Sequence, residues 1–317
     1  RRERINWLAG RQPLTRATVA WVETLVRLLP IKHVANLVGL HWHTVKAIDL
    51  GRLQRDVAPP ELNRVRRLIM DEFALYKGHR YATVAICADT QQVLWIGESR
   101  SREAVRPFFK WMGEDDCARI EAVAMDMNTA MDLEVQAHCP NAQVVYDLFH
   151  VVAKFGREVV DRIRVDQANQ LKTDPSGRRA IKRSRWLLLR NRTNLDEAQT
   201  LKLDELLAAN APLMTAYLLK TQLKELWYAP SEQEARRRWN EWFRLAQESG
   251  LLPLQTFARR LKGHVEGIVS SARFRLNTSV LEGMNNRIKV IKRMAYGYRD
   301  SAYFFLKIKA AFPGKVR

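Results

Sequence analysis

The order of hydrophobic segments between residues 67 and 146 constrains the fold more than any other feature of this 317-residue chain. Three strand-like segments separated by short turns come first, and helix-like and strand-like segments then alternate. In chain order they are strands at 67–74, 80–88 and 93–97, a helix at 102–112, a strand at 122–125, a helix at 129–138 and a strand at 143–146. Short connections favour an antiparallel meander, whereas strands joined through helices pair in parallel. The pattern therefore predicts an α/β fold with helices on the faces of a sheet.

Two aspartates fall in or directly after predicted strands. Three antiparallel strands followed by a helix–strand–helix–strand run is the order expected of a ribonuclease-H-like fold, in which the first, fourth and fifth strands lie side by side. Asp71 in the first strand and Asp126 after the fourth would then be neighbours. Sites in open α/β sheets form at the carboxyl ends of parallel strands. A single aspartate at a strand end usually only caps or terminates an element, but the pair together points to a site.

A third acid, Glu282, lies in a segment with helical periodicity at 280–295. The apolar residues of this segment form one stripe, and Glu282 lies on a polar stripe beside it. The polar positions of the helix supply the candidate DNA contacts Asn286, Lys289, Lys292 and Arg293. A carboxylate at the edge of the buried stripe can face a cleft while its helix stays anchored. The alternative is a solvated helix face, which the presence of the two strand acids disfavours.

The chain is strongly basic, with a formal net charge of +19. Residues 67–150 are acidic, with a net charge of −5, whereas the residues before and after them carry +7 and +17. Lysine and arginine on this scale usually neutralise the phosphates of a nucleic acid. No apolar stretch approaches the roughly 18 residues that span a bilayer, and the N-terminus lacks a secretory pattern. We therefore expect a cytoplasmic protein whose partner is DNA or RNA and not a membrane.

The metal expected at the three acids is a hard cation. The three cysteines show no C-x-x-C spacing, and the seven histidines show no H-E-x-x-H pairing, so neither pattern supports a zinc site. Carboxylates are ligands that Mg²⁺ prefers, and Mn²⁺ can substitute for it. Two such ions about 3.5 to 4 Å apart can activate an attacking hydroxyl and stabilise the leaving oxygen of a phosphoryl transfer. Asp71, Asp126 and Glu282 are the metal ligands that this chemistry would use.

The first 60 residues have the pattern of a helix-turn-helix. Helical patterns lie on both sides of Gly39, which allows a turn between them. On the exposed face of the helix after this turn we expect Thr44 and Lys46, with His43 as a further candidate, to meet base edges or phosphates of DNA. The alternative is an ordinary pair of helices, because short two-helix patterns are common. The basic character of the segment favours DNA binding.

Further acids compete for a role in the site. Asp147 closes the last predicted strand, three residues before His150, and is open to interpretation as a metal ligand or as part of a separate structural or DNA-handling motif. His150 is interpreted as a histidine that forms a local hydrogen bond. Glu72 follows Asp71, but successive strand side chains point to opposite faces, so only one of them can face the site. Asp89 is interpreted as a turn residue.

Four stretches of the chain resemble, in wording and in order, the bacterial ISL-three insertion-sequence transposases. They are residues 71–81, 124–127, 147–151 and 282–299. The resemblance extends over roughly residues 15 to 312. It implies a ribonuclease-H-like catalytic core whose catalytic triad is Asp71, Asp126 and Glu282. It also implies that Asp147 and His150 form a D-x-x-H motif separate from the triad.

The resemblance also implies how the chain is divided. A helix-turn-helix domain at 1–60 precedes the first part of the catalytic core at 61–150. An all-α insertion at 151–276 interrupts the core, and a C-terminal helical part at 277–317 brings Glu282 back to it. Members of the family usually carry an N-terminal cysteine-rich zinc-binding segment. Because this chain lacks that segment and does not begin with methionine, we expect it to be a fragment of a longer protein.

The sequence thus predicts a DNA transposase of a bacterial insertion sequence, a cytoplasmic, nucleoid-associated protein whose partner is double-stranded DNA. Such an enzyme would cut at the ends of its element and join the 3′-hydroxyls to target DNA by metal-dependent phosphoryl transfer. Because two ends must be held together, we expect a homo-oligomer on DNA, although no sequence feature identifies the interface. Two alternatives stay open. They are a catalytically silent, transposase-derived DNA-binding regulator and a structure-specific nuclease with the same fold.

Overall fold

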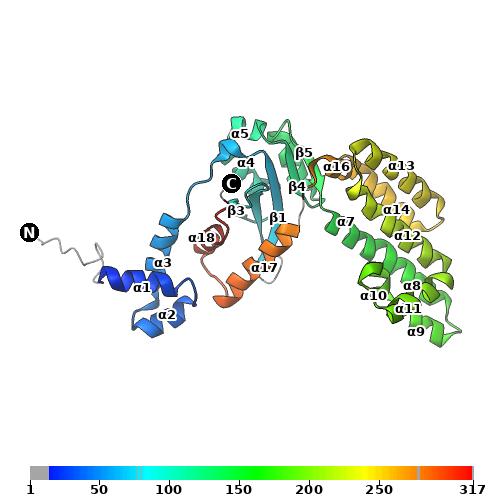
Figure 1. Ribbon diagram of the computed structural model, residues 1–317, viewed down its shortest axis with the longest axis horizontal. Helices are drawn as coiled ribbons and strands as arrows, with labels where there is room; N and C mark the ends of the chain where they lie inside the picture. The colour runs from blue at the N-terminus through cyan, green and yellow to red at the C-terminus, as the bar shows by residue number, and fades with distance from the viewer. Residues whose placement is uncertain (1–13, 77, 79, 277–278, 316–317) are drawn as a thin grey trace, which may run out of the picture. The chain divides into compact units, whose positions relative to one another are not determined.

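The computed structural model describes residues 14–76, 78, 80–276 and 279–315 (Figure 1). Contacts within the chain divide it into two compact units, of which residues 1–116 with 278–317 form the first and residues 117–277 the second. The first unit contains the N-terminal helices, a strand meander and the C-terminal helices. The second contains a parallel strand pair and the helices that follow it. The four-part domain scheme drawn from the sequence stays a prediction.

The helices and strands follow the predicted order. Those of the first unit are α1 (Arg16–Leu25), α2 (Ile31–Val38), α3 (Trp42–Asp56), the 3₁₀ turn η1 (Leu62–Arg64), β1 (Arg67–Tyr76), β2 (Arg80–Cys87), β3 (Val93–Glu98), α4 (Arg102–Met112), α17 (Ser279–Met294) and α18 (Ser301–Ala311). The short helix α5 (Glu114–Ala118) lies where the chain passes to the second unit. Each predicted element between residues 67 and 146 agrees with the structure to within two residues at either end. The α/β class is therefore confirmed.

The second unit is mostly helical. Its elements are β4 (Ala122–Met125), α6 (Thr129–His138), β5 (Gln143–Tyr146), α7 (Leu148–Phe155), the π turn η2 (Gly156–Val160), α8 (Asp161–Gln170), α9 (Pro175–Arg183), α10 (Arg185–Leu189), η3 (Arg192–Asn194), α11 (Glu197–Ala208), α12 (Ala211–Glu225), η4 (Leu226–Tyr228), α13 (Glu232–Glu248), α14 (Leu252–Leu261), η5 (Lys262–His264), α15 (Val265–Val269) and α16 (Ser271–Phe274). The described part of the chain contains no helix with both the length and the apolar character needed to cross a membrane.

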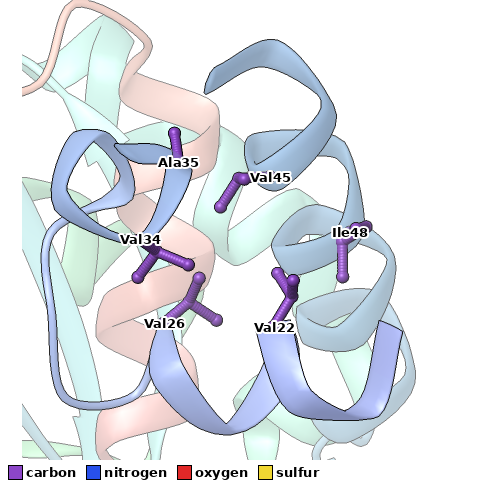
Figure 2. Packing of buried hydrophobic residues seen from close by; sticks show 6 residues of the cluster. All are labelled: Val22, Val26, Val34, Ala35, Val45 and Ile48. Atoms are coloured by element: carbon purple, nitrogen blue, oxygen red, sulfur yellow. The ribbon is translucent and has the colours of Figure 1, made fainter. Parts of the chain in front are cut away.

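A small hydrophobic core holds α1, α2 and α3 together (Figure 2). All three helices contribute to it, and its side chains are at most 5% exposed: Val22, Val26, Val34, Ala35, Val45 and Ile48. Helix α2 ends at Gly39, whose φ of 67° is a left-handed conformation that glycine adopts without a Cβ clash. This turn directs the chain into α3. The predicted helix-turn-helix is thereby confirmed.

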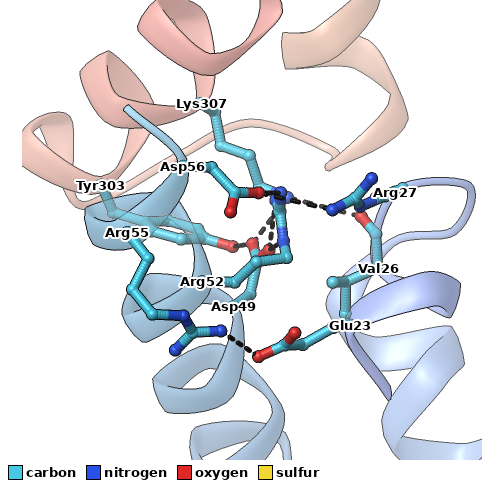
Figure 3. Close-up of polar contacts among 9 residues, drawn as sticks. All are labelled: Glu23, Val26, Arg27, Asp49, Arg52, Arg55, Asp56, Tyr303 and Lys307. Carbon is cyan, nitrogen blue, oxygen red and sulfur yellow. Dashed lines mark hydrogen bonds and ion pairs between the residues drawn. The ribbon is translucent and has the colours of Figure 1, made fainter. Parts of the chain in front are cut away.

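A buried ionic cluster joins α3 to α18 (Figure 3). The Asp49 carboxylate is fully buried and accepts hydrogen bonds from the Arg52 guanidinium at 2.7 and 3.0 Å. The Tyr303 hydroxyl donates to the other Asp49 oxygen, and the Lys307 ammonium lies 2.6 Å from that oxygen. Burial lowers the pKa of Lys307, and the attraction of Asp49 opposes this effect. Helix α3 is therefore fixed to the C-terminal helix as well as to its neighbours in the helix-turn-helix.

The strands of the first unit form an antiparallel meander in the order β3-β2-β1, as predicted. Asp71 lies in the middle of β1, opposite Val84 of β2. The last six residues of β2 are all buried, which is typical of a strand covered on both faces. Helix α4 packs against β3, and α17 packs against β1 (Figure 1). These contacts place the helix that carries Glu282 on the strand that carries Asp71.

In the second unit, β4 and β5 pair in parallel, with Met125 opposite Tyr146. Helix α15 packs closely on β5, because a Cβ added at Gly267 would lie 2.5 Å from the Tyr146 ring. From α7 to α16 the described residues form helices and turns without a strand, and α7 continues through the π turn into α8. That this helical region is an insertion into a ribonuclease-H-like fold stays a prediction.

Replacing Asp49 with alanine should strongly destabilise the first unit. The substitution leaves the buried Arg52 and the partly buried Lys307 without their shared carboxylate, and removing one partner of a buried ion pair costs about 3 to 5 kcal/mol. Urea unfolding followed by tryptophan fluorescence measures the change. The control is Glu23→Ala, which breaks a more exposed pair with Arg55 and should cost less than about 1 kcal/mol. Equal effects of the two substitutions would contradict the role given to Asp49.

Candidate functional site

Two carboxylates meet at the carboxyl ends of β4 and β5. Asp126 follows Met125, the last residue of β4, and Asp147 follows Tyr146, the last residue of β5. Because Met125 and Tyr146 are register partners in a parallel pair, the two aspartates emerge side by side. The Asp147 N–H also donates to the Met125 carbonyl at 3.0 Å. The two acids lead into α6 and α7, whose N-terminal ends carry partial positive charge that favours nearby carboxylates.

His150 binds both carboxylates. Asp147 caps α7, since its Oδ1 accepts the Phe149 N–H at 2.9 Å, and its Oδ2 lies 2.8 Å from His150 Nδ1. The same nitrogen contacts Oδ1 of Asp126. Each of the three side chains offers one ligand atom, and these atoms lie within 4.8 Å of one another. Asp147 is buried, whereas Asp126 and His150 are partly exposed, so the cluster is accessible from solvent.

The protonation of His150 balances the charge of the two acids. Burial by itself would lower the pKa of His150, but the hydrogen bonds with Asp126 and Asp147 outweigh burial and raise the pKa to about 10. The imidazolium reduces the repulsion between the adjacent carboxylates. The pKa of His150 in the folded protein is higher than the value of about 6.5 that histidine has in an unfolded chain. Protonation of His150 therefore stabilises the fold, and this contribution is fully present below about pH 6.5. Its contribution is lost as the pH rises through about 10.

The cluster has a donor set that fits a hard divalent cation. Two carboxylates suit Mg²⁺, which completes its shell with water, and Mn²⁺ also accepts an imidazole nitrogen. The ligand atoms are close enough together to reach one ion. The sequence placed Asp126 in a triad and left Asp147 open as a metal ligand or, with His150, as part of a separate motif. The structure brings all three side chains together.

In the first unit, α17 binds Asp71 directly. The side-chain amide of Asn285 donates to Asp71 Oδ2 at 2.7 Å, and the Glu72 N–H donates to Oδ1 at 2.7 Å. The Asn285 Oδ1 atom is buried and has no hydrogen-bond partner among the described residues, so it is an oxygen that a cation or a water could satisfy. Glu282 is exposed and lies three residues before Asn285, hence on the same side of the helix. Asn285 was not identified as a site residue from the sequence. Its position three residues after Glu282, on the same side of the helix, was the signal that could have identified it.

The predicted DNA contacts on α17 differ in their surroundings. Asn286, Lys289 and Arg293 are exposed. Lys292 instead binds β1, where its ammonium donates to the Ala74 carbonyl at 3.2 Å. It also lies 5.9 Å from the centre of the Tyr76 ring. Lys292 therefore anchors α17 on the strand.

The predicted DNA contacts on α3 also differ. The Lys46 ammonium forms an ion pair at 2.7 Å with Asp300, the N-cap of α18, and lies 5.2 Å from the centre of the Tyr303 ring. Lys46 thus faces the C-terminal helix. Thr44 is half-buried, and His43 is exposed. A role of these residues in DNA binding stays a prediction.

The two other acids have structural partners. Asp89 lies in the turn between β2 and β3 and forms an ion pair with Arg67, so its interpretation as a turn residue is confirmed. Glu72 forms an ion pair with Arg100 at 3.3 Å. Its neighbour Asp71 is the member of the adjacent pair that contacts α17.

In the metal-free protein, His150 should remain protonated across neutral pH. Its two carboxylate partners hold the pKa near 10, so NMR titration of the imidazole nitrogens should show no transition between about pH 6 and 8. His264 is the matched control, because burial lowers the pKa of this imidazole and it should be neutral at pH 7. A His150 transition near pH 6.5 would show that the carboxylate contacts do not form in solution.

Comparison with known proteins identifies the family. Residues 68–308 match the ISL3 family of DDE sequences, whose description is transposase. Residues 3–51 match the helix-turn-helix domain of transposase family ISL3. The transposase for insertion sequence element IS1001 of Bordetella parapertussis is 55% identical over 317 residues, which is 100% of this chain and 78% of that protein. The transposase for insertion sequence element IS1557 of Mycobacterium tuberculosis is 28% identical over 308 residues, covering 89% of this chain and 68% of that protein. The chain therefore belongs to the ISL3, or ISL-three, family of insertion-sequence transposases.

Proposed function

We propose that this transposase cuts DNA at the ends of its insertion sequence and joins the 3′-hydroxyls to target DNA, with Asp71, Asp126 and Glu282 as the catalytic carboxylates. The observation that carries the proposal is the cluster of Asp126 with Asp147 and His150 at the ends of two parallel strands. Carboxylates gathered at a strand edge in a basic chain suit metal-assisted chemistry on a polyanion. The family match, which spans all three acids, supports the same reaction class.

Some residues of the chain would bind a cation, Mg²⁺ or Mn²⁺, and others would orient the residues that bind it. When bound, such an ion supplies Lewis-acid stabilisation of charge at the transferring phosphoryl group. In the second unit, Asp126 and Asp147 offer the oxygens, and His150 orients both of them through Nδ1. In the first unit, the hydrogen bond from Asn285 fixes the orientation of Asp71. Residues that hydrogen-bond to a metal ligand without binding the metal themselves orient that ligand and raise metal affinity.

We also propose that the catalytic core is ribonuclease-H-like and is interrupted by an all-α insertion. Three antiparallel strands followed by α4, β4, α6 and β5 give the chain order of that fold. Helices then fill residues 148–274 before α17 carries Glu282. Glu282 is thus remote in sequence from the strand acids, and its helix packs on β1 within the first unit.

Double-stranded DNA, both the element ends and the target, is the proposed partner. Residues 151–317 carry a net charge of +17, which suits phosphate binding. The exposed side chains Asn286, Lys289 and Arg293 follow Glu282 on α17, where they can contact the backbone near a scissile phosphate. We propose that the protein acts as a homo-oligomer on DNA, because the reaction holds two ends together. Its proposed location is the bacterial cytoplasm, on the nucleoid.

The Glu282→Gln variant tests the catalytic proposal. Removing the charge of a carboxylate ligand while keeping its shape should lower strand cleavage and joining at least about 100-fold and leave DNA binding unchanged. The assay follows Mg²⁺- or Mn²⁺-dependent nicking and joining of a plasmid that carries the element ends. The matched control is Glu248→Gln, which alters an exposed glutamate at the end of α13.

The outcomes of this assay separate the alternatives. If Glu282→Gln cuts and joins as well as the wild type, Glu282 is structural. If neither protein cuts but both bind the ends, the chain is a DNA-binding regulator. Release of cut ends without joining by the wild type would instead identify a nuclease.

The Asn285→Ala variant tests the support of Asp71. Loss of the amide frees the Asp71 carboxylate, so the Mn²⁺ concentration for half-maximal cleavage should rise about 10- to 100-fold. The adjacent Asn286→Ala variant is the control, because Asn286 is exposed and should affect DNA affinity without changing the metal requirement. An unchanged metal requirement in Asn285→Ala would mean that this residue only anchors α17.

A further inference from the structure

Two faces of α3 are occupied by contacts within the first unit. On the first face, Val45 and Ile48 pack against α1 and α2 in the hydrophobic core (Figure 2). On the second, Asp49 binds Tyr303 and Lys307 of α18 (Figure 3). The ion pair between Lys46 and Asp300 extends this second face toward the start of α3. These contacts fix the rotation of α3 about its own axis.

The third face of α3 points to solvent along its length. Its residues have the spacing of one helical stripe, and they are His43, Ala47, Gly51 and Gln54. His43, Ala47 and Gln54 are exposed, and Gly51 at the edge of the stripe is half-buried. From His43 to Gln54 the stripe rises about 16 Å, at about 1.5 Å per residue. The stripe contains no acidic side chain that would repel a phosphate backbone.

Gly51 lies in the interior of helix α3, where glycine is unfavourable. A glycine inside a helix destabilises it by comparison with alanine, so its presence calls for a reason. Packing within the protein does not supply that reason, because the nearest atom to an added Cβ is the mobile end of the Arg55 side chain at 3.7 Å. The backbone of Gly51 is also not in the left-handed region. A remaining reason is close approach of another molecule to the helix surface.

We propose that the stripe of His43, Ala47, Gly51 and Gln54 is the face of α3 that reads base edges in the major groove of duplex DNA. The proposal rests on the DNA-binding function proposed above and names the residues that give it sequence preference. A stripe about 16 Å long suits a helix that lies lengthwise in the groove, which is about 12 Å wide and admits one α-helix. The small residues Ala47 and Gly51 let the backbone of the helix approach the bases.

The chemistry of the stripe favours A·T pairs at two positions of the site. A glutamine amide can donate to N7 and accept from N6 of the same adenine, so Gln54 is assigned to an adenine. The methyl group of Ala47 suits contact with the methyl group of a thymine. Lys46 has a different role, because its ion pair with Asp300 holds α3 against α18.

Selection from a pool of duplexes with 20 random base pairs, using the full chain, tests this assignment. Wild type should enrich a motif that includes A·T pairs. Gln54→Ala should reduce the preference at one adenine by roughly 5- to 100-fold and leave the other positions intact. Gly51→Ala should raise the melting temperature of the protein while weakening binding to the selected motif. Gln222→Ala, which removes an exposed glutamine of α12 in the second unit, is the control and should select the wild-type motif.

The results separate this inference from the catalytic proposal. If Gln54→Ala and Gly51→Ala both select the wild-type motif with wild-type affinity, the stripe does not read DNA and the inference is overturned. The same follows if the wild type selects no motif. Cleavage of a plasmid that carries the element ends is measured in parallel with the wild type. If that plasmid is cut while the stripe variants keep their preference, only the inference fails, and if it is not cut, the catalytic proposal fails.

Discussion

Parallel pairing of β4 with β5 is the constraint on which the candidate site depends. The register sets Met125 beside Tyr146, so the next residue of each strand is an aspartate at the same edge. Two adjacent carboxylates repel each other, and a fold that places them together needs a positive group nearby. His150 meets this need, because the helix that Asp147 caps carries the imidazole back to both acids within one turn. A single backbone pairing thus determines the position of three side chains.

The first unit brings a remote helix to its strand by polar contacts. Asn285 and Asp71 are 214 residues apart in sequence, yet one hydrogen bond joins them. The Lys292 contact with the Ala74 carbonyl gives α17 a second attachment to β1, two turns farther along the helix. Two attachments fix both the position and the rotation of α17. The direction in which Glu282 points is therefore set by residues that are not themselves acids.

Local patterns in the sequence predicted the helices and strands well. The features that the sequence did not predict depend on contacts between residues far apart in the chain. Alternating and helical periods, with turn residues such as Gly39, depend on neighbours in the chain and located the strands and helices closely. The contact of Asn285 with Asp71 has no local signature. Nor does the cluster around Asp49, whose partner Tyr303 is 254 residues away. Lys46 was expected on an open face because the sequence of one helix does not reveal that a second helix, α18, covers that side.

The π turn between α7 and α8 has a consequence for comparing relatives of this chain. A π turn holds one residue more than an α turn, so each residue after Val160 is rotated by about 100° from a regular continuation of α7. Gly156 opens this turn where an added Cβ would lie 2.8 Å from Leu189. An alignment with a one-residue gap at this point would therefore join two proteins whose helices both stay continuous. Because the π turn absorbs the extra residue, residues aligned beyond the gap would stay equivalent in space, whereas residues paired without the gap would lie about 100° apart around the helix.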